Sequence, residues 1–238
     1  MCGRYVSPEL AALQREYRAE LNRQLGLSDA QERAYEQSYN VAPTQLVPVV
    51  RVIREHADVR EAVLMRWGLI PFWAKGVPPK YSTINCTIEN METAATWRDA
   101  WKRSQRCIIP CAGFYEWKIL EDGKTKQPYF IKPSATETFA LAGLWDMSIA
   151  QSGEKIMSCA TLTMPANEIM RDIHNSKQRM PAILEHSDID AWLCGSSEQA
   201  RAALRPYPSD EMIAWPVSTR VNTPKNNSAD LIAPFQAA

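Results

Sequence analysis

The stretch 106-RCIIPCAGFYEWKILEDGKTKQPYFIKPSATETFALAGLWDMSIAQSGEKIMSCATLT-163 sets the architecture, because it holds five strand-like runs in succession. The runs are rich in β-branched and aromatic residues, and they cover residues 106–109, 113–118, 128–131, 139–145 and 157–163. Between the second and third runs, Glu121-Asp122-Gly123-Lys124 forms a turn, since Asp-Gly supplies the positive φ of a tight hairpin. No helical pattern separates the runs, so the stretch predicts a mostly antiparallel sheet.

Further strands and short helices flank this stretch. Residues 45–53 and 60–67 have strand patterns, and Pro48 indicates an edge position or a bulge in the first of them. A helix is expected from Ser7 to Gly26, where a capping Ser and a Pro precede apolar residues at helical spacing. Shorter helices are expected at 96–103, 165–173, 187–193 and 197–204, and a last strand at 213–217.

Strands outnumber helices in this pattern and do not alternate with them. This predicts an α+β fold, with a mostly antiparallel, barrel-like β-sheet core and peripheral helices. No repeat, low-complexity block or linker divides the chain, so we expect a single domain over residues 1–238.

The composition excludes several classes of protein. The chain has 238 residues, 45% of them hydrophobic, and its 27 Lys and Arg balance 27 Asp and Glu, so no overall field attracts a polyanion. No apolar run reaches the ~18–20 residues that span a bilayer, and the N-terminus lacks the pattern of a signal peptide. We expect a cytoplasmic monomer with no membrane partner, associated with the nucleoid in a bacterium.

The six cysteines do not form a metal-binding pattern. Cys107 and Cys111 are four residues apart but lie in an apolar run, and no second Cys or His pair follows at zinc-ligand spacing. In a reducing compartment such cysteines stay free thiols. We expect Cys107, Cys111 and Cys159 to pack in the core, with no metal and no cofactor.

Cys2 is the most informative reactive residue. Aminopeptidases commonly remove an initiator Met that precedes a small residue, and removal of Met1 gives Cys2 a free α-amine beside its thiol. The amine condenses with an aldehyde to an imine, and the thiol then closes a stable five-membered thiazolidine. Neither group needs extreme tuning, because a free α-amine has a pKa of about 7.7–8.0 and a Cys thiol of about 8.5. The sequence therefore predicts a nucleophile at residue 2.

Two ionisable residues stand in unusual places. Glu116 lies inside an aromatic strand, where period-2 alternation puts it on the same face as Phe114. An inward-facing carboxyl group is suited to proton transfer, whereas an outward-facing one pairs with a residue such as Lys118. His174 follows a short helix and precedes basic residues, so it is either a proton shuttle or a helix C-cap.

Aromatic and basic residues interleave between Arg66 and Lys75, in the sequence RWGLIPFWAK. Such a surface binds single-stranded nucleic acid by base stacking and backbone charge. The alternative is a Trp-rich edge of the core. The pattern leaves both interpretations open.

Together these segments resemble the SRAP family, the SOS-response-associated peptidases or abasic-site processing proteins. The matching segments, in order, are Met1–Arg4, Tyr39–Thr44, Arg66–Pro71, Asn85 with Glu89, Gly113–Trp117, Ala142–Trp145, Thr161–Thr163, Ala166–Asn167, His174, Arg179–Pro181, Pro216–Ser218 and Val221–Asn222. Each match alone is weak, but their joint order spans nearly the whole chain.

The resemblance implies the SRAP fold and a role in the SOS response and in DNA repair. It implies that the chain senses abasic sites in single-stranded DNA and that Cys2 forms a thiazolidine DNA–protein crosslink, with self-processing and with lyase or crosslink-reversal activity. The implied catalytic residues are Cys2, Asn85, Glu116 and His174, and the implied DNA contacts are Arg4, Pro43, Trp67 and Thr163.

Two other activities fit the same residues. An N-terminal cysteine peptidase uses Cys2 with Glu116 and His174 as acid and base, and a non-catalytic single-stranded DNA-binding protein uses only the aromatic surface. The chain also departs from the family pattern after Asn85, where Cys86-Thr87 replaces the usual Ala-Arg and removes one cation.

Overall fold

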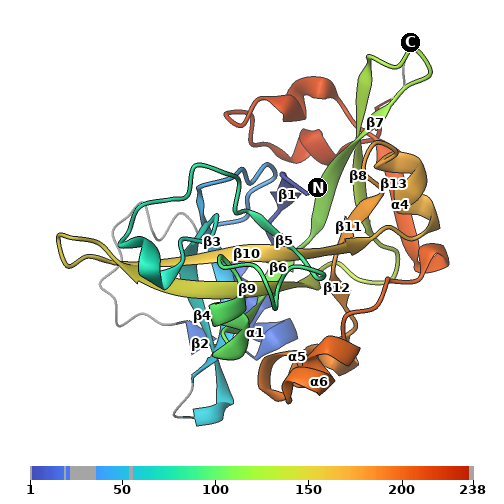
Figure 1. The fold of residues 1–238 in the computed structure, drawn as a ribbon. Helices are drawn as coiled ribbons and strands as arrows, with labels where there is room; N and C mark the ends of the chain where they lie inside the picture. The colour runs from blue at the N-terminus through green and yellow to red at the C-terminus, as the bar shows by residue number, and fades with distance from the viewer. Residues whose placement is uncertain (1, 19, 22–35, 54–55, 236–238) are drawn as a thin grey trace.

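A computed structural model describes residues 2–18, 20–21, 36–53 and 56–235. Its core is a five-stranded barrel in which the strands follow the order β10-β4-β3-β6-β9, and β9 pairs with β10 to close the ring (Figure 1). The strands are β3 (Leu46–Ile53), β4 (His56–Trp67), β6 (Arg106–Cys111), β9 (Phe139–Ile149) and β10 (Lys155–Pro165). The predicted α+β class with a barrel-like core is confirmed. The barrel is mixed, because β10 runs parallel to β4.

A second, four-stranded sheet has the order β1-β7-β8-β13. Its strands are β1 (Tyr5–Val6), β7 (Gly113–Ile119), β8 (Lys126–Pro133) and β13 (Met212–Pro216). Only Ala112 separates β6 of the barrel from β7, so the chain passes directly from one sheet to the other. The expected turn joins β7 to β8, and Gly123 in it has a φ of +67°.

The remaining elements are short and lie at the periphery. The other strands are β2 (Glu20–Leu21), β5 (Asn85–Thr87), β11 (Arg179–Pro181) and β12 (Ile183–Leu184). The helices are α1 (Leu10–Tyr17), α3 (Arg98–Lys102), α4 (Glu168–Ile173), α5 (Ile189–Cys194) and α6 (Ser197–Ala202). Single 3₁₀ turns occur at Phe72–Ala74, His186–Asp188, Ser209–Glu211, Thr219–Asn222 and Ala229–Ile232. No helix in the described residues is long and apolar enough to cross a membrane.

Two local predictions are wrong. The first helix ends at Tyr17 instead of Gly26, because Arg18 has a φ of +50° and β2 then pairs with β4. Residues 22–26 lie outside the described residues. The strand with Pro48 is not an edge strand, since β3 lies between β4 and β6. Pro48 is tolerated because β6 pairs with β3 only at Val50.

Both faces of β7 are covered. Phe114 belongs to the main core, while Tyr115 packs in a second cluster with Phe130. Glu116 is also buried, so of the two orientations that the sequence left open the structure has the inward one. Cys107, Cys111 and Cys159 are fully buried free thiols, which confirms their place in the core.

Candidate active site at the N-terminus

Cys2 lies just before β1, an end strand of the four-stranded sheet, and packs in the main hydrophobic core. Figure 1 marks this end of the chain with N. The backbone N–H of Tyr115 donates to the carbonyl of Arg4 at 3.0 Å, and Tyr5 pairs with Phe114. This pairing brings the segment before β1 alongside Glu116. Cys2 is only 1% exposed, although it stands one residue from the start of the chain. Its Sγ lies 3.6 Å from the carbonyl oxygen of Arg4.

Asn85 holds the backbone of Cys2. It starts β5, which runs parallel to β10 and places Asn85 opposite Thr161. Its Nδ2 donates to the carbonyl oxygen of Cys2 at 2.8 Å. Its Oδ1 is buried and accepts no hydrogen bond from the described part of the protein. A buried acceptor of this kind is costly to leave unpaired, so it is available for a donor on a ligand.

Glu116 and His174 form a buried pair beside Cys2. Glu116 is 3% exposed and His174 is 4% exposed. Nε2 of His174 lies 4.0 Å from Oε2 of Glu116. His174 Nδ1 lies 2.8 Å from the carbonyl oxygen of Arg179. A carbonyl only accepts, so Nδ1 carries a proton, and Nε2 is the ring nitrogen that faces Glu116. The pair is arranged for proton transfer.

A salt bridge fixes the carbonyl that orients His174. Arg179 donates to both carboxylate oxygens of Glu89, at 2.8 and 2.9 Å, and to the carbonyl oxygen of Thr163 at 2.6 Å. The Arg179 hydrogen bonds hold the pKa of Glu89 below its usual range. The Arg179 guanidinium thus connects β11 to β10 and to the segment after β5. These three segments together hold the carbonyl that sets the tautomer of His174.

The Cys2 thiol is protonated at neutral pH. Burial raises its pKa from the ordinary value of 9.0 to about 12, and the nearby Glu116 charge adds to this shift. Desolvation penalises the thiolate, and a negative neighbour repels it. Sulfur attack by this residue therefore needs a base that takes the thiol proton during the reaction.

The raised pKa predicts a specific loss of stability in alkali. Above pH 9 the thiol ionises in the unfolded chain but not in the folded one, so its contribution to stability is complete below pH 9 and falls as the pH approaches 12. Between pH 8 and pH 10.5 we expect the free energy of unfolding to fall by about 2 kcal/mol more in wild type than in the variant Cys2→Ala. Urea unfolding at both pH values measures this, and parallel losses in the two proteins would contradict it.

The predicted phosphate and lesion contacts have partners within the protein. The Arg4 guanidinium donates from Nη1 to Oδ1 of Asn40 at 2.8 Å and to the carbonyl of Val221 at 2.7 Å. Thr163 is fully buried in β10, and its hydroxyl donates to the carbonyl of Cys86 at 3.5 Å. Their roles at DNA stay predictions.

The aromatic segment divides into a buried and an exposed part. Trp67 is 1% exposed, so this ring belongs to the core and offers no stacking face. Pro43 is half-buried just before β3. Phe72 and Trp73, in contrast, are 44% and 46% exposed, and the guanidinium carbon of Arg103 lies over the Phe72 ring, 4.4 Å from its centroid. The core-edge interpretation is therefore confirmed for Trp67, whereas base stacking on Phe72 and Trp73 and the DNA contacts of Pro43 and Trp67 stay predictions.

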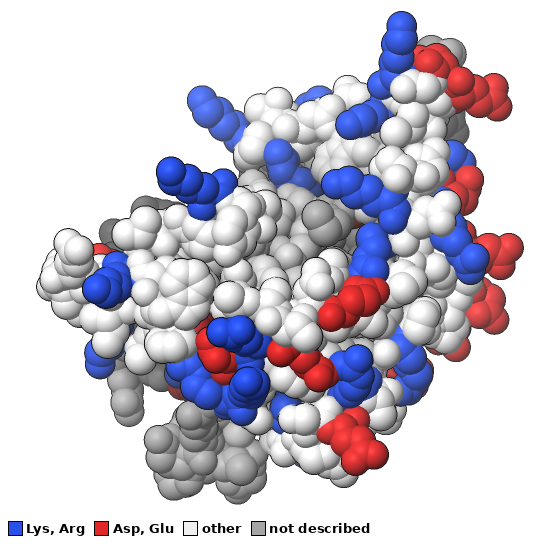
Figure 2. Space-filling view, viewed as in Figure 1, with Lys and Arg blue, Asp and Glu red and all other residues white. Residues whose placement is uncertain are grey.

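The face that carries the N-terminal site is hollowed. Figure 2, in the same view as Figure 1, shows this hollow between the two sheets, and Lys and Arg side chains border it on several sides. The chain has equal numbers of acidic and basic residues, so this local gathering of cations is what an anionic ligand would meet.

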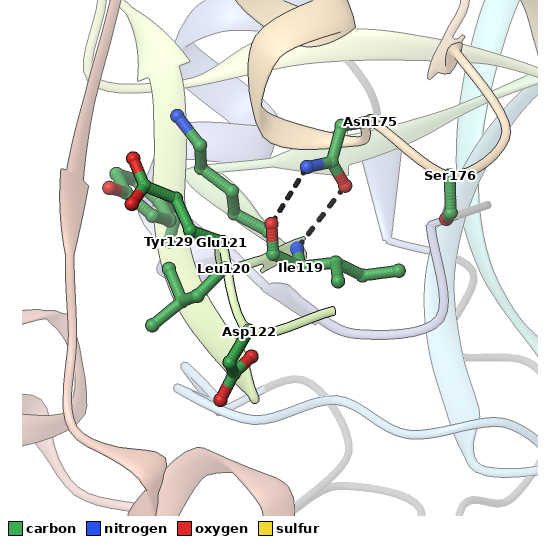
Figure 3. A pocket seen from close by; sticks show the side chains of 8 residues that line it. Ile119, Leu120, Glu121, Asp122, Tyr129, Asn175 and Ser176 are labelled. Carbon is green, nitrogen blue, oxygen red and sulfur yellow. Dashed lines mark hydrogen bonds between the residues drawn. The ribbon is translucent and has the colours of Figure 1, made fainter. Parts of the chain in front are cut away.

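A separate pocket of about 950 Å³ lies beside the β7–β8 hairpin and does not include Cys2 (Figure 3). On one wall, the side chain of Asn175 donates to the carbonyl of Ile119 at 2.8 Å and accepts from its N–H at 3.2 Å. These two hydrogen bonds anchor the residue after His174 to the strand that carries Glu116.

Comparison with known proteins identifies the family. The model of the family described as SOS response associated peptidase (SRAP) matches residues 1–224. The chain belongs to the SRAP family. The resemblance stated from the motifs is thereby confirmed, and the SRAP match includes the segments that carry Cys2, Asn85, Glu116 and His174.

Several SRAP relatives have names that describe abasic site processing. Abasic site processing protein YoaM of Bacillus subtilis (strain 168) is 42% identical over 204 residues, which cover 83% of this chain and 85% of YoaM. Abasic site processing protein HMCES of Gallus gallus is 31% identical in an alignment of 268 positions, gaps included, that covers 99% of this chain and 78% of HMCES.

Solved structures share the SRAP fold. A crystal structure of a Bacteroides thetaiotaomicron protein superposes with a TM-score of 0.79 at 21% identity and covers 99% of this chain and 100% of its own. A Bordetella bronchiseptica protein gives a TM-score of 0.75 at 26% identity and covers 91% of this chain and 100% of its own.

Sequence reasoning missed two positions in this SRAP chain. Asn40 is 1% exposed and Glu89 binds Arg179, yet neither received a role from the sequence. Both lie in segments matched to the SRAP pattern. Their function is to bind distant parts of the chain, which no local pattern reveals.

Proposed function

We propose that this protein captures abasic sites in single-stranded DNA through Cys2 after removal of Met1. The observation that carries the proposal is the burial of an N-terminal Cys between Asn85 and the Glu116–His174 pair. The names of the SRAP relatives support abasic sites as the target. Ring opening of an abasic deoxyribose gives an aldehyde, which is the electrophile that an aminothiol takes.

The raised thiol pKa supports an order for the two bond-forming steps. A free α-amine with a pKa of about 7.7–8.0 is partly neutral at pH 7.5, whereas the Cys2 thiol is protonated. The amine therefore adds first to the aldehyde carbon, and the resulting carbinolamine loses water to give an iminium ion. The thiol then adds to the same carbon and releases its proton, which closes the thiazolidine with a net loss of one water.

Both steps move protons, and the buried pair is suited to them. Loss of water from the carbinolamine needs an acid, and attack by the thiol needs a base. Glu116 is the group that serves Cys2 most directly, since its charge acts on the thiol. His174 Nε2 exchanges protons with Glu116 over 4.0 Å, and Asn85 holds the Cys2 backbone during ring closure.

We assign DNA binding to the hollow on the face of the N-terminal site and to exposed aromatic side chains. Arg4 and Pro43 are the proposed contacts on this path, while the buried Trp67 and Thr163 are proposed to form the wall beneath it. Trp73 adds an exposed ring on which a base stacks. We propose that the protein acts as a monomeric, single-domain enzyme with no metal or other cofactor.

A denaturing gel tests this function. Protein whose N-terminus is Cys2, verified by intact mass, is incubated with a single-stranded oligonucleotide that carries one abasic site. A heat-resistant shifted band supports the proposal. Binding without such a band favours the non-catalytic DNA-binding protein, and cleavage of peptide substrates in place of crosslinking favours the N-terminal cysteine peptidase.

Replacement of His174 is expected to slow reversal of the crosslink. In His174→Ala a preformed adduct should decay at least about tenfold more slowly than in wild type, because ring opening needs a proton on the sulfur. The decay is followed by gel after transfer to an excess of unlabelled abasic DNA. The variant His186→Ala is the matched control, and wild-type decay in His174→Ala would remove the residue from the mechanism.

A further inference from the structure

A segment near the C-terminus reaches back to the N-terminal site. We name residues 218–227 the C-terminal strap. Asn40 is buried beneath it, and its Nδ2 donates to the strap carbonyls of Val221, Thr223 and Asn226 at 3.1, 3.1 and 2.9 Å. One amide group thus binds three backbone oxygens of the strap. The side chain of Asn40 has no spare donor for another role.

Arg4 also binds both Asn40 and the C-terminal strap. Its Nη1 donates to Oδ1 of Asn40 and to the Val221 carbonyl, and its Nη2 donates to the Asn222 carbonyl at 3.1 Å. The Arg4 carbonyl meanwhile accepts the N–H of Tyr115 in β7. Arg4 is therefore held at its backbone by the sheet and at its side chain by the strap.

The hydrogen bonds of Arg4 to Asn40 and the strap lie two residues from Cys2, the proposed nucleophile. Chain ends fray unless they are tied down. Here Tyr5 and Val41 exchange backbone hydrogen bonds of 3.3 and 2.8 Å in an isolated bridge, which fixes the neighbour of Arg4 to the residue after Asn40. Asn85 holds the carbonyl of Cys2 itself. The N-terminal segment is thus fixed at successive residues up to the reactive one.

We infer that Asn40 and the C-terminal strap are positioning elements for Cys2, acting through Arg4; this inference rests on the proposed function. The strap has other attachments that do not involve Arg4. Trp117 Nε1 donates to Oδ1 of Asn222 at 2.8 Å, and Asn227 accepts from Ser38 and Tyr39. Loss of the Asn40 bonds therefore loosens the N-terminal segment before it releases the strap.

The variant Asn40→Ala tests the inference by separating rate from affinity. A misplacement of about 1 Å at a reacting group costs on the order of 100-fold in rate. We expect the crosslinking rate at saturating abasic DNA to fall at least tenfold. Affinity for an oligonucleotide with a tetrahydrofuran abasic analogue, measured by anisotropy, should stay within about twofold.

Asn227→Ala is the matched control. It removes two hydrogen bonds of the same strap, from Tyr39 N at 2.7 Å and Ser38 Oγ at 3.2 Å, but none to Arg4. Its crosslinking rate should stay within about twofold of wild type. Equal rates in Asn40→Ala and Asn227→Ala would overturn the inference.

Hydrogen exchange gives a readout that needs no DNA chemistry. The Tyr5 amide, bonded to Val41, should exchange faster in Asn40→Ala than in Asn227→Ala. If Asn40→Ala does not fold, Arg4→Lys replaces it in the exchange experiment only, because Lys keeps the charge but not the guanidinium fork and Arg4 is also a proposed DNA contact. Unchanged exchange at Tyr5 in a folded variant would also overturn the inference. A wild type that binds DNA without a crosslink contradicts the proposed function, while the exchange result still decides the placement of the terminus.

Discussion

Cys2→Ala is expected to abolish the heat-resistant crosslink to abasic DNA, with a loss of at least about 1,000-fold in its yield per unit time. The variant keeps an α-amine, so an imine still forms, but an imine hydrolyses on heating. Only sulfur addition converts it into a stable ring. The measurement is a time course on denaturing gels with a single abasic site in the oligonucleotide.

The matched control for Cys2→Ala is Cys2→Ser, which preserves the size of the side chain. A hydroxyl is a much weaker nucleophile than a thiol at neutral pH. We expect the Ser variant to form an adduct that survives only after borohydride reduction of the imine. A heat-stable, untrapped adduct with Ser would show that the sulfur ring is not the product, and retained crosslinking in Cys2→Ala would place the nucleophile elsewhere.

Glu116→Gln is expected to slow crosslinking by about 100-fold or more while the affinity for abasic DNA changes less than twofold. General acid–base catalysis contributes typically 10²–10⁴-fold, and an amide of the same shape neither gives nor takes the proton. Single-turnover rates at saturating DNA measure the effect. Anisotropy with the tetrahydrofuran analogue measures the affinity.

Glu121→Gln is the control for this substitution, because Glu121 is an exposed carboxylate in the β7–β8 turn. It makes the same change of charge away from Cys2 and should leave the rate unaltered. If Glu116→Gln loses binding and rate in equal measure, Glu116 has a structural role and the proposed proton transfer is wrong. Thermal unfolding of both variants detects a loss of folding.

The sequence predicted those parts of the fold that depend on local pattern. All five strands between Arg106 and Thr163 formed, because alternation, β-branched residues and the Asp122-Gly123 turn act over a few residues. Closure of the barrel was only expected in outline, and the parallel pairing of β10 with β4 was not foreseen. The first helix ends at Tyr17, earlier than its helical spacing predicted, because the chain then forms β2 and pairs with β4.

At the site, too, the sequence predicted what a local pattern determines and missed contacts between residues far apart in the chain. Alternation correctly placed Glu116 on the same face as Phe114, since the side-chain period of a strand is fixed, but the burial of that face was left open. The run from Arg66 to Lys75 did not reveal that Trp67 is buried while Trp73 is exposed, because an aromatic ring suits either environment. Asn40 was missed because its partners lie 181 to 186 residues further along the chain.

The strap has a consequence for the biosynthesis of the protein. A polypeptide is made from its N-terminus onward, so Cys2 leaves the ribosome long before residues 218–227 exist. Until then Arg4 and Asn40 lack the carbonyls that they bind in the finished molecule. If the strap positions Cys2 as inferred above, this placement is complete only after residues 218–227 have been made, and chains that end before them lack these hydrogen bonds.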